Sequence, residues 1–261
     1  MIGQTKLINY IDGLKTVPHF IVIVGSKGSG KTTLAKYIAE KLNATFSVCG
    51  IKVDEIREII DTAYHVRDKV VYCIKDGDTM RPEAKNAMLK ITEEPPENAY
   101  FILTVQDESS LLATIKSRAV VLTIEPYSKQ DIIDYATATK QSILDYLDIA
   151  MTPYELDVLN AYGKEFLEFV ELVVDNIAEV EPSNAFKSSS KLALKSDEGY
   201  DLKLFFQTFT KICISRITRN TLKYANGAIA TIPFEMECTK LGVNKQQLYD
   251  RWVFKIREVW A

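Results

Sequence analysis

The chain has 261 residues, of which 47% are hydrophobic and 26% are charged, and its net charge is −3. This length and mixture are typical of a globular protein with one large domain or two to three smaller ones. The acidic balance argues against a dedicated nucleic-acid binder, because such proteins usually carry a basic excess. Any contact with nucleic acid must therefore come from a few placed residues or from a larger assembly.

The first half of the chain predicts alternating strands and helices. Residues 20–24 are apolar at every position and mostly β-branched, which is typical of a strand buried on both faces. Further strands are expected at residues 45–49, 69–74, 99–104 and 120–124. Apolar residues at helical spacing predict helices over residues 34–42, 53–60 and 82–93. This order indicates an α/β fold with a parallel sheet flanked by helices.

Beyond Pro126 the apolar spacing becomes helical. We expect helices throughout residues 128–178, interrupted at Pro153 and Gly163, and then a polar stretch that includes residues 188–190 and 195–199. Long amphipathic helices are predicted over residues 202–217 and 248–260, and the first carries an aromatic set expected in a core or a subunit interface: Phe205, Phe206 and Phe209. We therefore divide the chain into an α/β domain (1–126), a small helical domain (127–181) and a C-terminal helical domain (182–261).

The cysteines and the apolar stretches indicate the cellular compartment in which the protein is expected. No two cysteines form a CxxC pair, so we expect no zinc module, and a reducing cytoplasm fits the chain. The N-terminal residues lack the apolar segment of a signal peptide, and the stretch around residues 20–24 is too short to span a bilayer. We therefore predict a cytoplasmic protein without a membrane partner.

A glycine-rich loop follows the first predicted strand and leads directly into the first predicted helix. Its residues are Gly25, Ser26, Lys27, Gly28, Ser29, Gly30, Lys31 and Thr32, with Thr33 next. The glycines let backbone amides turn toward a phosphate, and the helix N-terminus favours negative charge. Lys31 is expected against the β- and γ-phosphates, and the Thr32 hydroxyl on Mg²⁺. This segment therefore predicts a site for ATP and Mg²⁺.

The residues after the third predicted strand leave ATP hydrolysis open. In ATPases with such a loop, an acidic residue at this strand end usually holds magnesium, and a following glutamate activates water. Here Lys75 stands at the first position and Asp76 at the second. Asp76 is therefore the candidate for both roles, as a catalytic residue and as a magnesium ligand. Its short side chain, and the competition of Lys75 with magnesium for the phosphate charge, argue against a vigorous ATPase.

Two further motifs carry a family resemblance. The run from Asn86 to Asn98, NAMLKITEEPPEN, resembles the signature helix of clamp-loader ATPases, typically NALLKxLEEPP. Ser117-Arg118-Ala119 resembles their Ser-Arg-Cys motif, with alanine in place of cysteine. Gly3-Gln4 and Pro18-His19 also match the N-terminal pattern of that family. The chain is similar to the delta-prime and gamma subunits of bacterial DNA polymerase III, and more distantly to eukaryotic replication factor C small subunits, most strongly over residues 1–125.

This resemblance implies an AAA+ module, a helical lid and a helical collar that joins subunits into a ring. It implies that Arg118 acts in trans, on the γ-phosphate held by a neighbouring subunit, where a guanidinium neutralises charge on the phosphoryl oxygens. The lid would supply a basic residue in cis, by position Lys164, although an ion pair with a nearby glutamate is an equal alternative. A sensor residue would fall at Val105 or Gln106, and we select Gln106 because its amide can donate a hydrogen bond.

The function implied is that of an ATP-binding clamp-loader subunit, which helps to open a sliding clamp and place it on primed DNA. The implied partners are other clamp-loader subunits, the sliding clamp and primer–template DNA, whose backbone Lys85 and Lys90 could contact. Lys75 favours an alternative, a non-hydrolysing structural subunit like delta-prime. A second alternative is an AAA+ protein of another DNA transaction, such as helicase loading or transposition, against which the clamp-loader motifs argue. The interval from Lys31 to Lys75 leaves no room for the zinc module that bacterial relatives often carry.

Overall fold

A computed structural model describes residues 2–143, 146–179, 188–194, 198–217, 221–240 and 242–260. The chain forms two compact units: the first comprises residues 1–138 with 152–154, and the second comprises residues 139–151 with 155–261. The three-part division at residues 126 and 181 stays a prediction. Its second boundary, like residues 195–197 of the expected polar stretch, lies outside the described residues.

The first unit is built on a five-stranded sheet with the order β2-β3-β4-β1-β5. Every neighbouring pair of strands is parallel, which confirms the predicted sheet. The predicted strands agree with the observed ones to within one residue at each end. The strands are β1 (Phe20–Val24), β2 (Thr45–Cys49), β3 (Val70–Ile74), β4 (Ala99–Val105) and β5 (Val120–Thr123).

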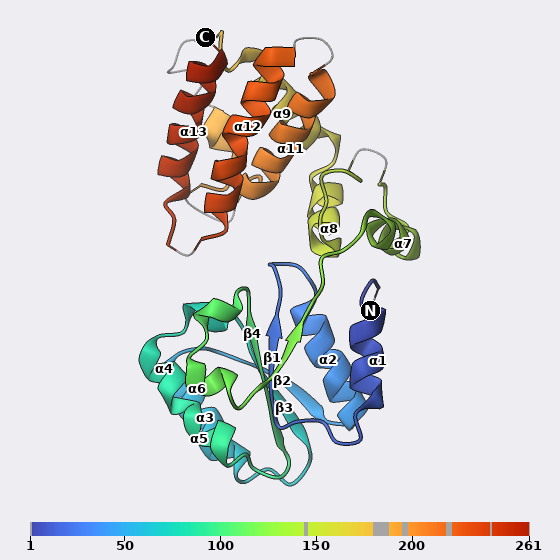
Figure 1. Cartoon of the computed structure of the whole chain (residues 1–261), viewed down its shortest axis with the longest axis vertical. Coiled ribbons are helices and arrows are strands. Elements are labelled where there is room, and N and C mark those ends of the chain that lie inside the picture. The colour runs from blue at the N-terminus through green and yellow to red at the C-terminus, as the bar shows by residue number, and fades with distance from the viewer. Residues whose placement is uncertain are drawn as a thin grey trace. The chain divides into compact units, whose positions relative to one another are not determined.

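Helices cover both faces of this sheet (Figure 1). On one face lie α1 (Thr5–Gly13) and α2 (Lys31–Leu42). On the other lie α3 (Val53–Ala63), α4 (Pro82–Ala87), α5 (Leu89–Glu93) and α6 (Ala113–Lys116). The helix predicted over residues 82–93 is interrupted by a turn at Met88. Two short 3₁₀ helices, η1 (Gly77–Thr79) and η2 (Glu108–Ser110), follow β3 and β4, and neither they nor α1 were predicted.

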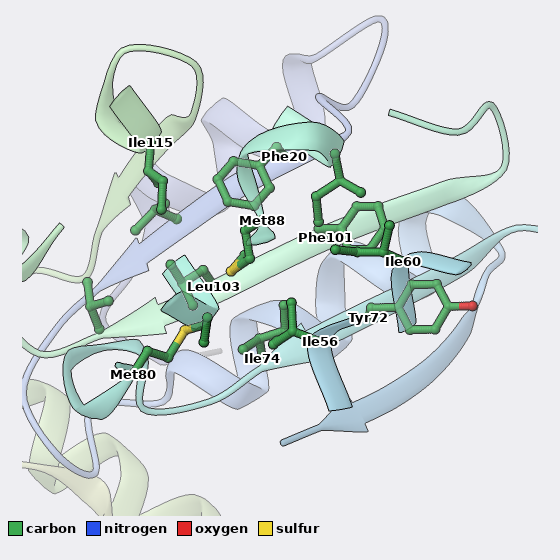
Figure 2. Close-up of a cluster of buried hydrophobic side chains, with 14 of the residues drawn as sticks. Phe20, Ile56, Ile60, Tyr72, Ile74, Met80, Met88, Phe101, Leu103 and Ile115 are labelled. Atoms are coloured by element: carbon green, nitrogen blue, oxygen red, sulfur yellow. The ribbon is translucent and has the colours of Figure 1, made fainter. Parts of the chain in front are cut away.

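Alternate side chains of β1 enter two separate hydrophobic clusters, because successive residues of a strand point to opposite faces. Phe20 and Val22 pack with Phe101 and with side chains from the helices α3 to α6, the cluster drawn in Figure 2. Ile21 and Ile23 pack with the side chains of α1 and α2 on the opposite face. A fully apolar strand is therefore required at this position, and it explains the unbroken hydrophobic run in the sequence.

The helices beyond Pro126 agree only in part with the prediction. They are α7 (Lys129–Thr139), α8 (Pro153–Tyr162), α9 (Lys164–Asn176), η3 (Ser188–Lys191), α11 (Leu202–Arg216), α12 (Thr221–Cys238) and α13 (Lys245–Trp260). The expectation of helix throughout residues 128–178 is wrong for the described residues between α7 and α8. There Lys140 adopts a left-handed φ of 57°, which ends α7, and the chain becomes helical again only at Pro153. The helix α12 was not predicted.

The core of the second unit is aromatic. Phe205, Phe206 and Phe209 of α11 are completely buried, which confirms their predicted place in a core. Their ring centroids lie 5.2, 5.3 and 4.8 Å from that of Trp252 on α13. The Trp252 indole N–H donates to the Thr231 hydroxyl of α12 at 3.0 Å, so its polar atom is satisfied inside the core. In the described ranges, no helix has the length and apolar character needed to cross a bilayer.

Candidate nucleotide-binding site

The glycine-rich loop leaves β1 at Gly25, whose N–H donates to the Val105 carbonyl of β4 at 3.1 Å. A Cβ at Gly25 would lie 2.6 Å from the Ser29 hydroxyl oxygen, so the loop closes on itself too tightly for any side chain there. Gly28 and Gly30 have φ values of 78° and 93°, a region that residues with a Cβ rarely adopt. Gly25 is required because there is no room for a side chain, and Gly28 and Gly30 are required by their backbone conformation. Together the three glycines form a tight turn at the carboxyl edge of the sheet.

The loop ends at the N-terminus of α2, which has no side-chain cap. Gly30 is the N-cap residue and offers no side-chain acceptor to the first amides of the helix. An uncapped N-terminus with its partial positive charge favours an anion. The Lys31 ammonium lies in the same turn, where it donates to the carbonyls of Gly25 at 2.7 Å and Ser26 at 2.8 Å. These donors meet the chemical requirement of a phosphate site.

The carboxylates of Asp76 and Asp78 favour the protonated form of Lys31. Burial lowers the pKa of Lys31 from its ordinary value, and the negative charges of Asp76 and Asp78 oppose that shift. The structure therefore brings together the predicted site residues Lys31 and Asp76, although 45 positions separate them in the chain. It also adds Asp78, to which sequence reasoning assigned no role.

Asp76 follows β3 directly after Lys75, in the position that the sequence predicted. Its backbone is left-handed, with φ of 57°, and its side chain is exposed. Its N–H donates to the hydroxyl of Thr104 on β4 at 3.3 Å, and its carbonyl accepts from the Thr79 hydroxyl at 2.8 Å. Asp76 therefore stands at the turn between β3 and η1, and its role as a base or a magnesium ligand stays a prediction.

Two tyrosines that sequence reasoning missed lie against the loop. The Tyr127 hydroxyl donates to the Ser29 carbonyl at 2.7 Å, and burial raises the pKa of Tyr127 to about 12. A Cβ at Gly28 would lie 2.7 Å from the Cβ of Tyr154, which belongs to the same compact unit. Both tyrosines are distant in sequence from the loop and belong to no motif, so only the fold could identify them.

The remaining predicted site residues belong to other parts of the chain than the loop. Gln106 directly follows Val105, the residue whose carbonyl binds the loop. Arg118 forms an ion pair with Glu93 at 2.9 Å and donates to the Thr114 carbonyl at 2.9 Å. Lys164 is exposed at the first position of α9, and it belongs to the second unit. Its contact with a nucleotide stays a prediction.

The two lysines considered for DNA contact already have partners within the chain. The Lys85 ammonium donates to the Ser110 carbonyl at 2.7 Å. The Lys90 ammonium lies 5.1 Å from the ring centroid of Tyr64, a cation–π contact. Both contacts are formed by the isolated chain, and a role in DNA binding stays a prediction for each lysine.

The residues of the loop fit a magnesium–nucleotide complex. The Ser29 hydroxyl is buried without a hydrogen-bond partner, and Thr32 lies half-buried in the first turn of α2. Among the described residues, no group of three or more His, Cys, Asp or Glu side chains is arranged to hold a metal ion. Magnesium usually takes one or two protein ligands together with phosphate oxygens and water, so a dedicated protein cage is not required. Lys31 and the loop amides would hold the phosphates, and Thr32 would hold the metal.

Several known proteins with similar sequences are subunits of DNA polymerase III. A family model described as "DNA polymerase III, delta subunit" matches residues 47–128. The chain is 29% identical to the DNA polymerase III subunit gamma of Buchnera aphidicola subsp. Schizaphis graminum over 169 residues, which cover 52% of this chain and 47% of that protein. It is 27% identical to the tau subunit of Escherichia coli over 154 residues, which cover 46% of this chain and 24% of that protein. The match thus spans less than half the length of these relatives.

Solved structures show the same fold. A DNA polymerase III gamma subunit-related protein from Thermotoga maritima matches with a TM-score of 0.57 and 16% identity, covering 98% of this chain and 99% of that chain. The RuvB Holliday junction branch migration motor of Thermotoga maritima matches with a TM-score of 0.52 and 18% identity, covering 83% of this chain and 76% of that chain. The chain thus has the AAA+ fold that its sequence predicts, and it is similar to the gamma and delta subunits of DNA polymerase III.

Proposed function

We propose that this chain is an ATP-binding subunit of a sliding-clamp loader that acts in the cytoplasm. The observation that carries the proposal is the loop from Gly25 to Thr32, where Lys31 and an uncapped helix N-terminus converge beside Asp76. The similarity to DNA polymerase III subunits supports the assignment to replication. Within a hetero-oligomer, the chain would hold ATP with Mg²⁺ and help to open a clamp and place it on primed DNA.

In this proposal Arg118 binds the γ-phosphate of the nucleotide held by a neighbouring subunit, so its contact depends on assembly. It lies on the short segment after α6, and its ion pair with Glu93 holds the guanidinium at the protein surface. A guanidinium offers two parallel N–H donors to phosphate oxygens, so it suits the γ-phosphate of a nucleotide held by a neighbour. Gln106 and Lys164 would contact the nucleotide held by the chain itself.

An exposed apolar face on α12 supports association with another helical subunit. Leu222, Ile229 and Met236 are spaced seven residues apart, Ile232 lies between the last two, and all four residues are 46% to 72% exposed. A seven-residue apolar repeat is the pattern by which one helix packs against another. On a soluble helix this face would normally be polar. We therefore assign it to contact with the helical C-terminal unit of a neighbouring subunit.

The test combines nucleotide binding with assembly. Equilibrium binding of a fluorescent ATP analogue should depend on Mg²⁺ and weaken about tenfold to a hundredfold when Lys31 is replaced by methionine. A pull-down with the replicative clamp and partner clamp-loader subunits should recover this chain, with ATP strengthening the complex. The absence of any association with the clamp and those subunits, with or without ATP, would refute the clamp-loader assignment.

A second candidate is a non-hydrolysing structural subunit of the same machine. Lys75 favours it, because it stands at the end of β3 where a magnesium-holding acid is expected, and Asp76 is the only carboxylate left in the pair. ATP turnover should be measured for the wild type and for Asp76→Ala, alone and within the assembled complex. Turnover that falls about tenfold or more in Asp76→Ala assigns hydrolysis to this chain, whereas equal turnover in both proteins assigns it to the neighbours.

A further inference from the structure

The Asp78 carboxylate accepts hydrogen bonds from the segment that follows β4, residues 106–110. One of its oxygens, Oδ2, accepts from the Gln106 N–H at 2.7 Å. The other, Oδ1, accepts from the Asp107 N–H at 3.2 Å and lies 2.9 Å from the Ser110 hydroxyl. The Lys85 ammonium donates to the Ser110 carbonyl at 2.7 Å and holds the far end of the same segment. One half-buried side chain on η1 therefore fixes residues 106–110 at three points.

A glycine makes this arrangement possible. Gly77 is buried beside β4, and a Cβ there would lie 2.6 Å from Leu103 Cδ1 and 3.1 Å from Val105 Cγ1. Any side chain at this position would push η1 away from the end of β4. The glycine lets the turn pack directly on the strand, so that Asp78, the next residue, reaches the first two amides beyond Val105.

Residues 106–110 are connected to the glycine-rich loop through Val105, by one backbone hydrogen bond that is followed by a hydrogen bond from the Lys31 side chain. Val105, which precedes Gln106, accepts from the Gly25 N–H at 3.1 Å, and the Gly25 carbonyl accepts from the Lys31 ammonium at 2.7 Å. Asp78 also lies close enough to Lys31 for its charge to favour the protonated ammonium. The same carboxylate thus acts on the loop lysine through its charge and on Gln106 through a direct hydrogen bond.

We propose that Asp78 is a positioning residue of the nucleotide site, which holds the backbone of Gln106 so that its side-chain amide meets the γ-phosphate of ATP. The inference rests on the proposed ATP binding. Asp78 acts through Gln106, because both of its carboxylate oxygens accept hydrogen bonds from residues 106–110. An aspartate satisfies this geometry because it accepts at both oxygens, whereas an asparagine would turn an N–H₂ group toward a backbone donor.

The test compares ATP with ADP, because only ATP carries a γ-phosphate. Affinities for fluorescent ATP and ADP analogues are measured for the wild type, Asp78→Asn, Gln106→Ala and the double variant. We expect Asp78→Asn to weaken ATP binding about threefold to tenfold, as the loss of a hydrogen bond of about 1 kcal/mol predicts. ADP affinity should change less than about twofold. The double variant should bind ATP no more weakly than Gln106→Ala, since the two residues act as one unit.

Amide hydrogen exchange supplies a second measurement that does not require nucleotide. The amides of Gln106 and Asp107 should exchange faster in Asp78→Asn, because each loses its acceptor. Asp54→Asn is the matched control, since the Asp54 side chain is 98% exposed, and it should alter neither exchange nor affinity. Equal weakening of ATP and ADP, or additive losses in the double variant, would overturn the role of Asp78. A wild-type chain that binds neither nucleotide would overturn the proposed function as well.

Discussion

The Arg118 guanidinium and the Glu93 carboxylate form an ion pair, with Nη2 2.9 Å from Oε1. The two residues are 25 positions apart, and they join the end of the signature helix to the Ser-Arg motif. The two motifs were identified separately in the sequence. The structure shows that the signature helix supplies Glu93 as the ion-pair partner of Arg118 in the Ser-Arg motif.

The first prediction concerns the stability of this pair. The Arg118 side chain is 36% exposed and that of Glu93 is 55% exposed, and exposed ion pairs contribute about 0.2–1 kcal/mol. Arg118→Ala and Glu93→Ala should therefore each lower the free energy of unfolding by less than about 1 kcal/mol. Urea unfolding followed by circular dichroism measures this. A loss well above that range would show that Arg118 is needed to fold the domain, and would weaken its assignment to a neighbour's nucleotide.

Lys31→Met should weaken nucleotide binding strongly while it preserves the fold. The variant removes a charged donor to phosphate, which predicts a loss of ATP affinity of about tenfold to a hundredfold. The free energy of unfolding should change by about 1 kcal/mol or less, because relief of the buried charge offsets the lost hydrogen bonds. Fluorescence titration and urea unfolding measure the two effects. Lys36→Met, an exposed lysine of the same helix, is the matched control and should leave ATP affinity intact.

Ile229→Asp should weaken association of the chain with partner subunits. Ile229 is 66% exposed on α12, so a charge there should leave the second unit folded while it disrupts an apolar interface. Analytical ultracentrifugation of the mixed subunits should show a shift toward free chain. Lys240→Asp, an exposed change just beyond α12, is the control. Unchanged assembly in Ile229→Asp would remove the α12 face from the interface.

The Glu155–Lys203 pair should show an asymmetric response to substitution. Glu155 of α8 is 6% exposed and accepts from Lys203 of α11 at 2.7 Å, whereas Lys203 is 28% exposed. Lys203→Met removes the ammonium that pairs with the buried Glu155 carboxylate and should cost about 2–4 kcal/mol of unfolding free energy. Glu155→Gln leaves an ammonium that reaches water, so its cost should be smaller. Thermal and urea unfolding of both variants check the order, and the reverse order would contradict it.

Tyr127 should make the stability of the first unit fall at alkaline pH. Its pKa is raised from the ordinary value of 10 to about 12, mainly by burial. The folded state thus keeps its proton where the unfolded state has lost it. The stability tied to this group is fully present below pH 10 and is lost as the pH rises through about 12. Tyr127→Phe should show a flatter decline in unfolding free energy between pH 10 and about 12, the interval between the two pKa values. An identical pH dependence in both proteins would contradict the assignment.

Most of the first unit could be predicted from local pattern. The residues from Phe20 to Val24 must be buried on both faces, and only a central parallel strand offers that environment. Gly28 and Gly30 are needed for left-handed backbone, so the loop could also be recognised in the sequence. The prediction failed between α7 and α8, where helical spacing of apolar residues is present but Lys140 turns the chain. It also missed α12, whose outward face is apolar and so lacks the polar side of an ordinary amphipathic helix.

The sequence alone determined the glycine-rich loop, the parallel α/β fold and the resemblance to clamp-loader subunits, because each depends on residues that are neighbours in the chain. Only the tertiary structure decided that Asp78 holds Gln106, that Glu93 pairs with Arg118 and that Tyr127 binds the loop. These contacts join residues 25 to 98 positions apart. Their distances depend on the order of the strands and the packing of helices on the sheet, which local spacing does not specify.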